Sequence, residues 1–152
     1  MKNLKIKTQL LQLCHQSLET RLQSILVVIE DIKQSMQSET KSSAGDKHET
    51  GRAMLQLERE KAGHQLAEIE KTKQILSKIN PESTSKNIGL GSVVFTTTSN
   101  YFISISAGEL KVDSDTIYAI SASTPIGQLL LGKSVGDEVT FRNMTFEITE
   151  IL

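Results

Sequence analysis

Two acidic residues in the first half of the chain have the spacing of a small metal-binding or catalytic site. Asp46 and Glu49 stand three residues apart, directly after Gly45 and at the expected start of a helix. Residues with this spacing lie on one side of a helix, so the two carboxylates would converge. Convergent carboxylates are suitable ligands for Mg²⁺, which prefers oxygen and keeps several of its waters. The pair also has the form of a capping box, in which each side chain binds an unpaired backbone N–H, and spacing alone favours that second interpretation.

Basic residues surround this acidic pair. Lys41 precedes it, Lys47 lies between the two acids, and Arg52 follows three residues after the second acid. Two interpretations of these cations stay open. They bind phosphate groups of a nucleic acid, or they only neutralise the two carboxylates on a solvated surface.

Heptad rows of apolar residues on both sides of the acidic pair predict two long helices that pack against each other. An a/d seam held over several heptads is typical of a coiled coil. The rows are Leu4, Leu11, Leu18, Ile25 and Ile32 with Leu22, Ile29 and Met36 in the first helix, and Leu55, Ala62, Ile69 and Leu76 with Leu66 in the second. Arg59 and Lys73 interrupt the second seam. Because the connection is short, we expect an antiparallel coiled-coil hairpin over residues 1–79, with its tip at about residues 40–50.

The composition changes after the hairpin. Residues 80–88 contain proline and small polar side chains and read as a linker. Residues 89–152 alternate β-branched and polar residues, and a Thr-Pro start with a glycine end predicts one short helix from Thr124 to Gly132. The expected strands are Ser92–Thr98, Tyr101–Ser106, Thr116–Ile120, Glu138–Phe141 and Met144–Ile148. The fold class is therefore α+β, with an antiparallel sheet of about five strands in the second domain.

The bulk composition excludes several classes of protein. The 152 residues carry 17 Lys and Arg against 18 Asp and Glu, which argues against extensive phosphate contacts along a nucleic-acid duplex. A single cysteine, Cys14, excludes an intramolecular disulfide and a Cys-rich zinc site, and its place in a helical pattern predicts a buried thiol. The chain has no apolar run of membrane-spanning length and no secretory signal at its start, so we expect a cytoplasmic protein without a membrane partner.

The chain resembles the bacterial GreA/GreB transcript-cleavage factors in three segments that occur in the same order. Gly45-Asp46-x-x-Glu49 resembles the Gly-Asp-x-x-Glu signature at the tip of their hairpin. Thr124-Pro125-Ile126 with Gly132-Lys133 and Asp137-Glu138-Val139 is similar to their Ser-Pro-Ile…Gly-Lys…Asp-x-Val segment, and residues 146–152 fit their last strand. The tip departs from the family pattern at Lys47 and His48 and again at Thr50, Gly51 and Arg52.

This resemblance implies a transcription elongation factor that is not itself an enzyme. It implies an FKBP-like C-terminal domain, residues 89–152, that binds RNA polymerase at the rim of its secondary channel, with Thr124, Pro125 and Ile126 as the expected contact region. The hairpin would enter the channel and bring Asp46 and Glu49 to the polymerase active site. There they would help to hold a Mg²⁺ ion shared with the polymerase and to position the attacking water, while the polymerase cleaves its own backtracked RNA. The nascent RNA 3′ end would be contacted inside the polymerase, and DNA only indirectly through the elongation complex.

Alternative functions stay open from the sequence. The first is a non-cleaving secondary-channel regulator that inhibits the polymerase. The second is a coiled-coil adaptor in which Asp46 and Glu49 only cap the helix. Prolyl isomerase activity is disfavoured, because the second domain lacks tryptophan and shows no convincing catalytic set. We expect a monomer, although the seam could also join helices from two chains.

Overall fold

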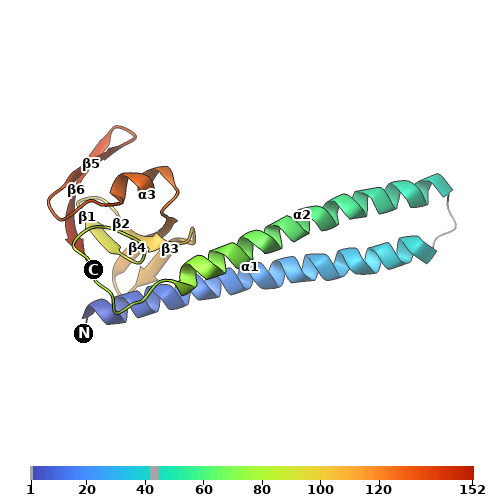
Figure 1. The fold of residues 1–152 in the computed structure, drawn as a ribbon, viewed down its shortest axis with the longest axis horizontal. Coiled ribbons are helices and arrows are strands. Elements are labelled where there is room, and N and C mark those ends of the chain that lie inside the picture. Colours follow the sequence, from blue (N-terminus) through green and yellow to red (C-terminus); the bar gives the residue numbers. More distant parts are fainter. Residues whose placement is uncertain (1, 42–44) are drawn as a thin grey trace. The chain divides into compact units, whose positions relative to one another are not determined.

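The computed structural model describes residues 2–41 and 45–152, and the side chains of residues 4–38 and 50–152. Two long helices come first, α1 (Lys2–Lys41) and α2 (Gly45–Ser77), followed by strands and one short helix, α3 (Pro125–Leu130) (Figure 1). The strands are β1 (Val93–Thr96), β2 (Asn100–Ser104), β3 (Gly108–Val112), β4 (Asp115–Ser121), β5 (Glu138–Phe141) and β6 (Met144–Ile151). The chain divides into two compact units, one of residues 18–72 and one that joins residues 1–17 to residues 73–152.

The unit of residues 18–72 is the predicted antiparallel helical hairpin (Figure 1). Leu55 of the predicted heptad row is half-buried, and the row is confirmed by five side chains that are at most 9% exposed. They are Leu18, Ile25 and Ile32 on α1 and Ala62 and Ile69 on α2. The companion row is only half-buried, as expected for two helices that cover each other from one side. Several apolar side chains therefore stay in solvent, among them Leu26, Val27 and Val28.

The second unit contains a mixed sheet of six strands in the order β3-β4-β2-β1-β6-β5. The predicted sheet was wholly antiparallel, and this was wrong at one pair, because β2 and β4 run parallel. The reason is β3, which the sequence analysis missed and which forms an antiparallel hairpin with β4 at the sheet edge. β3 is antiparallel to β4 through a turn at Asp113. The chain therefore reverses direction twice between β2 and β4, and these two strands run parallel.

Both faces of this sheet are buried. The adjacent residues Phe102 and Ile103 of β2 are fully buried, although neighbouring strand residues point to opposite faces. Ile103 packs in a core with Leu130 of α3. Ser104, on the same face as Phe102, lies 3.7 Å from Cys14 of α1, measured from Oγ to Sγ. The thiol is fully buried, as predicted, and α1 thus covers the face opposite to α3.

The first turns of α1 explain one wrong prediction in the seam. Leu4 is 38% exposed, whereas Ile6 and Leu10, two turns and one turn before Cys14 on the same side of the helix, are buried. The base of α1 therefore buries a stripe directed at the sheet in addition to the heptad row. Lys7 is also buried, and its Nζ donates a hydrogen bond of 2.6 Å to the carbonyl oxygen of Ser83 in the linker.

Candidate functional site

The predicted acidic pair lies at the start of the second helix. α2 begins at Gly45, so Asp46 and Glu49 occupy its first turn, and Lys41 is the last residue of α1. The side chains of Lys41, Asp46, Lys47 and Glu49 lie outside the described residues. Their convergence, their capping and their capacity to hold Mg²⁺ therefore remain predictions from the residue types and spacing. Arg52, the remaining predicted site residue on the hairpin, is described and exposed on α2.

The predicted partner-binding segment is a capped turn of helix. Thr124 has an extended backbone (φ −69°, ψ 157°), and its Oγ1 accepts a 3.1 Å hydrogen bond from the N–H of Gly127. The same hydroxyl donates to the carbonyl oxygen of Ser121 over 2.7 Å. Pro125 follows in the first turn, where its missing N–H removes nothing that the helix needs. The predicted N-cap, proline and helix are confirmed, although the helix ends at Leu130.

Close packing fixes the position of this turn against the preceding strand. A Cβ added to Gly127 would clash with the backbone carbonyl oxygen of Ser121. Only a glycine lets α3 approach the end of β4 this closely. The local sequence Thr-Pro-Ile-Gly is thus explained by geometry alone, independently of any partner.

The three predicted contact residues differ in what they offer to a partner. Pro125 is exposed, whereas Thr124 is half-buried by its cap. Ile126 is half-buried and packs against the core beneath α3. The surface that this turn presents is therefore centred on Pro125, and Ile126 mainly holds the turn on the sheet.

Exposed aliphatic residues beside this turn were missed by the sequence analysis. Leu129 and Leu131 are 39% and 40% exposed, while Leu130 between them is fully buried. The segment after α3 runs beside residue 88, because the N–H of Ile88 donates to the carbonyl oxygen of Lys133 over 2.9 Å. Leu90 and Val135, each two residues beyond this pairing, are also exposed. The run of three consecutive leucines was the available signal in the sequence. Neighbouring residues of a helix point in different directions, so one turn cannot bury all three side chains against the sheet.

The described part of the chain offers no independent metal centre. Among the residues that the structure describes, no three side chains of His, Cys, Asp or Glu form a group that could hold an ion. Within the same residues, no helix has the length and apolar character that a membrane span requires.

Comparisons with known proteins find a family match in the C-terminal part of the chain. Residues 85–152, which contain all six strands and α3, match the family model described as Transcription elongation factor, GreA/GreB, C-term. No curated protein matches the sequence. Among solved structures, the chain is similar to one described as "Structure of the transcription factor Gfh1". The sequence identity is 22%, and the similarity covers 98% of this chain and 92% of that chain. The TM-score is 0.34. Residues 85–152 are thus similar to the C-terminal domain of the GreA/GreB transcription elongation factors.

Proposed function

We propose that this protein binds RNA polymerase through the secondary channel and stimulates the cleavage of backtracked RNA by the polymerase active site. The observation that carries the proposal is the combination of a GreA/GreB C-terminal domain with a helical hairpin whose second helix opens on Gly45-Asp46-x-x-Glu49. Either feature alone is compatible with other functions. Together they match a factor that docks with one domain and acts with the other.

The C-terminal domain is the proposed docking module. An FKBP-like domain that binds at the channel rim could use the surface around Pro125, with the exposed side chains of Leu129 and Leu131 close to it. Exposed aliphatic side chains that gather in one region are characteristic of protein-binding surfaces. We include these two leucines with Thr124, Pro125 and Ile126 as the region to test for polymerase binding.

The tip of the hairpin is the proposed catalytic contribution. A Mg²⁺ ion shared with the polymerase would polarise the scissile phosphate and lower the pKa of the attacking water. Asp46 and Glu49 would supply oxygen ligands to this ion and orient the water, and Lys41, Lys47 and Arg52 would bind the RNA phosphates. Because the chain supplies only part of the site, the isolated protein should neither hold the ion tightly nor cleave RNA.

A cleavage assay in stalled, backtracked complexes of the cognate polymerase tests the proposal. Wild type should accelerate release of the RNA 3′ fragment in the presence of Mg²⁺, and Asp46→Ala/Glu49→Ala should lose that acceleration while still binding the polymerase. The matched control is Glu58→Ala/Glu60→Ala, which removes two exposed carboxylates from α2 away from the tip. The control should retain wild-type stimulation.

The other outcomes separate the alternatives. Binding without stimulation by wild type would contradict the cleavage proposal and leave a non-cleaving regulator. Full stimulation by Asp46→Ala/Glu49→Ala would reduce the two acids to helix caps. Absence of polymerase binding would leave an adaptor that shares the family domain only.

A further inference from the structure

The strand β3 forms one edge of the six-stranded sheet, so only one of its two sides is paired. It joins β4 through the two-residue turn Asp113-Ser114, and Val112 lies opposite Asp115. In a hairpin with two turn residues, the residues that flank the turn form a hydrogen-bonded pair, and such pairs alternate along the ladder. Leu110 is therefore the next residue of β3 that bonds to β4.

The backbone groups of Glu109 and Lys111 point away from β4, because these residues lie between the hydrogen-bonded pairs. A contact on the other side of β4 supports this alternation. Nδ2 of Asn100 in β2 donates a 3.3 Å hydrogen bond to the carbonyl oxygen of Thr116, so Thr116, which lies opposite Lys111, faces β2. The outer edge of β3 thus presents two N–H donors and two C=O acceptors that another strand could pair with.

The side chains on this edge carry opposite charges. Glu109 and Lys111 are both exposed, and their neighbours across the ladder, Tyr118 and Thr116, are uncharged. Among the described residues, neither charged side chain forms an ion pair. Charges on an edge strand commonly prevent it from pairing with another chain. This edge instead carries one charge of each sign, two residues apart, which another copy of the same edge can match.

We propose that β3 pairs with β3 of a second copy of the chain, antiparallel and related by a two-fold axis at Leu110. This register places Glu109 opposite Lys111 of the other copy, twice by symmetry. Because these residues carry the outward N–H and C=O groups, each pair forms two backbone hydrogen bonds, and the contact forms four in all. Opposite charges meet at both positions, so the contact is isologous and self-complementary.

Charge and hydrogen bonding together select this register. A shift of two residues would place Glu109 opposite Glu109 of the other copy, or Lys111 opposite Lys111. A shift of one residue would place the outward groups opposite groups that are already bonded to β4. Parallel pairing in register would set like charges side by side. Only the antiparallel register centred on Leu110 satisfies both requirements.

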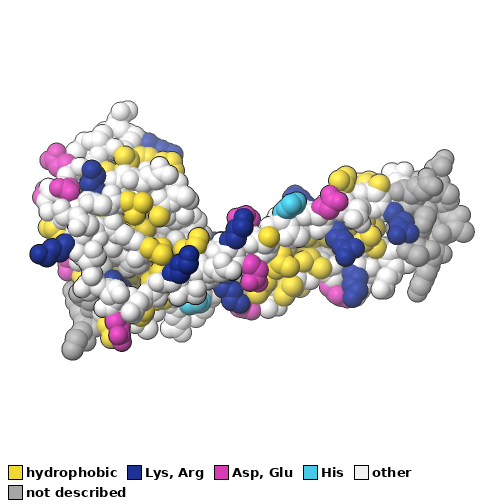
Figure 2. All heavy atoms as spheres, viewed as in Figure 1, with side chains coloured by type: hydrophobic (Ala, Val, Ile, Leu, Met, Phe, Trp, Pro, Cys, Tyr) yellow, Lys and Arg dark blue, Asp and Glu magenta, His cyan; other side chains and the backbone are white. Residues whose placement is uncertain are grey.

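The surroundings of β3 are compatible with a neighbouring strand. Gly108 would lie opposite Val112 of the other copy, and a Cβ added at Gly108 meets nothing within 4 Å. The chain has a net charge of −1, and Figure 2 shows coloured charges of both signs interspersed on the visible face, so no strong overall repulsion opposes a dimer. A contact of one short strand is small, and we expect a weak, transient dimer that forms at high micromolar concentrations. This contact does not depend on the proposed function.

Charge-reversed variants of the full chain test the register directly by sedimentation equilibrium. Glu109→Lys leaves two lysines on the edge and Lys111→Glu leaves two glutamates, so each variant alone should dimerise about tenfold more weakly than wild type. An equimolar mixture of the two variants should form a heterodimer at least as readily as wild type dimerises, because every pair again joins opposite charges. The matched control is Glu138→Lys, which makes the same change at an exposed position of the other edge strand, β5, and should dimerise like wild type.

Amide hydrogen exchange supplies a second readout at the contact itself. Exchange at Glu109 and Lys111 should slow as the concentration of wild type rises from micromolar to millimolar, and exchange at Thr140 of β5 should not change. Circular dichroism melting confirms that each variant is folded. A wild type that stays monomeric at every concentration, a mixture of variants that does not associate, equal weakening by Glu138→Lys, or protection at Thr140 in place of the β3 amides would each overturn the proposal.

Discussion

The two compact units solve the problem of burying apolar residues in opposite ways. In the sheet unit, α3 covers one face and the base of α1 covers the other, so that adjacent residues such as Phe102 and Ile103 are both fully buried. In the hairpin, each helix has only the other to pack against, and Val27 is 59% exposed. The sheet unit therefore has little freedom to accept changes in side-chain size. The hairpin has a thin core and leaves more of its apolar side chains exposed.

The largest expected effect is the loss of stability when a core side chain is truncated, and it should be greater in the sheet unit than in the hairpin. Phe102→Ala removes a fully buried ring from the sheet unit and should lower the free energy of unfolding by about 3–5 kcal/mol. Equilibrium unfolding in urea, followed by circular dichroism, measures this cost. A loss below about 1 kcal/mol would contradict the tight packing that we describe for this face.

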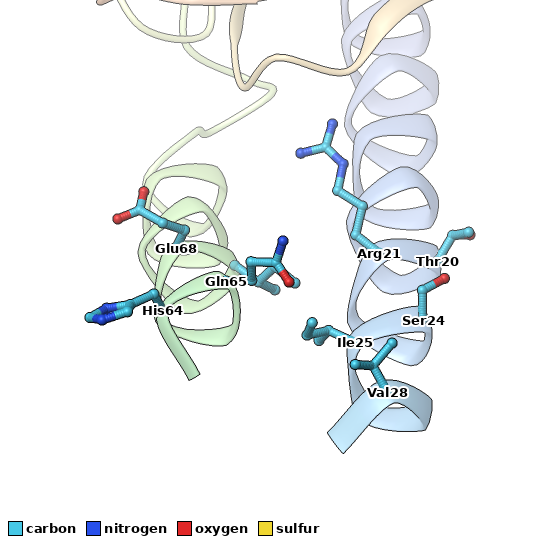
Figure 3. Close-up of a pocket in the computed structure, with 9 residues that line it drawn as sticks. Thr20, Arg21, Ser24, Ile25, Val28, His64, Gln65 and Glu68 are labelled. Carbon is cyan, nitrogen blue, oxygen red and sulfur yellow. The ribbon is translucent and has the colours of Figure 1, made fainter. Parts of the chain in front are cut away.

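The matching change in the hairpin should cost less. Ile25→Ala removes a side chain that is buried in the seam but also lines an open groove between α1 and α2, together with Val28 and Gln65 (Figure 3). The side chains around this groove have room to relax. We expect a loss of about 2 kcal/mol, the lower end for such substitutions. The same urea titration applies, and a loss equal to that of Phe102→Ala would show that the hairpin is packed as tightly as the sheet unit.

Two glycine substitutions should have opposite signs. Gly127→Ala drives a methyl group into the carbonyl oxygen of Ser121 and should destabilise by about 1–3 kcal/mol. Gly63→Ala, in the interior of α2 with nothing within 4 Å of the added Cβ, should stabilise by about 0.8–1.0 kcal/mol. Thermal melts of both variants provide the check. Destabilisation by Gly63→Ala would indicate that the hairpin is packed closely at that point.

The smallest predicted effect concerns Lys7 at the base of α1. Burial lowers the pKa of its ammonium group below the ordinary value of 10.5 in the folded protein. Between the lowered pKa and 10.5, the unfolded chain binds more protons, so the contribution of Lys7 to stability rises with pH. Burial also raises the pKa of Tyr101, which removes stability as the pH rises above 10.0.

A comparison of wild type with Lys7→Met separates these two groups. The contribution of Tyr101 is common to both proteins and cancels in the difference. Lys7→Met should gain most over wild type at neutral pH, and the difference in unfolding free energy should shrink as the pH approaches 10.5. A difference that is constant over this range would mean that the ammonium is as well solvated in the folded protein as in the unfolded one.

Local patterns predicted most of the fold, and contacts between distant segments account for what was missed. The heptad rows predicted the hairpin seam, and Thr124-Pro125 predicted the start of α3. By contrast, β3 has the sequence Gly-Glu-Leu-Lys-Val, which is weakly β-forming, and only its pairing with β4 makes it a strand. The buried stripe of Ile6, Leu10 and Cys14 depends on the sheet that covers it.

The candidate site also contains residues that the sequence could indicate and residues that only the tertiary structure reveals. Residue types and spacing placed Asp46 and Glu49 on one side of a helix but alone favoured capping, and only the resemblance to the GreA/GreB factors pointed to a site there. Their side chains lie outside the described residues, so this site stays a prediction. The exposure of Leu129 and Leu131 could not be assigned in advance, since a leucine run does not reveal which member faces the core. It took the position of α3 on the sheet to separate Leu130 from its neighbours.

The proposed function requires that the negative charges of the two tip acids act in the polymerase active site. The most direct measurement is Mg²⁺-dependent RNA cleavage in backtracked complexes with wild type and with Asp46→Asn/Glu49→Gln. These isosteric changes keep side chains that can still cap α2 but remove both negative charges. We predict unchanged helix content and polymerase binding with loss of the stimulated cleavage. Stimulation equal to that of wild type would contradict the account and assign the two residues to capping alone.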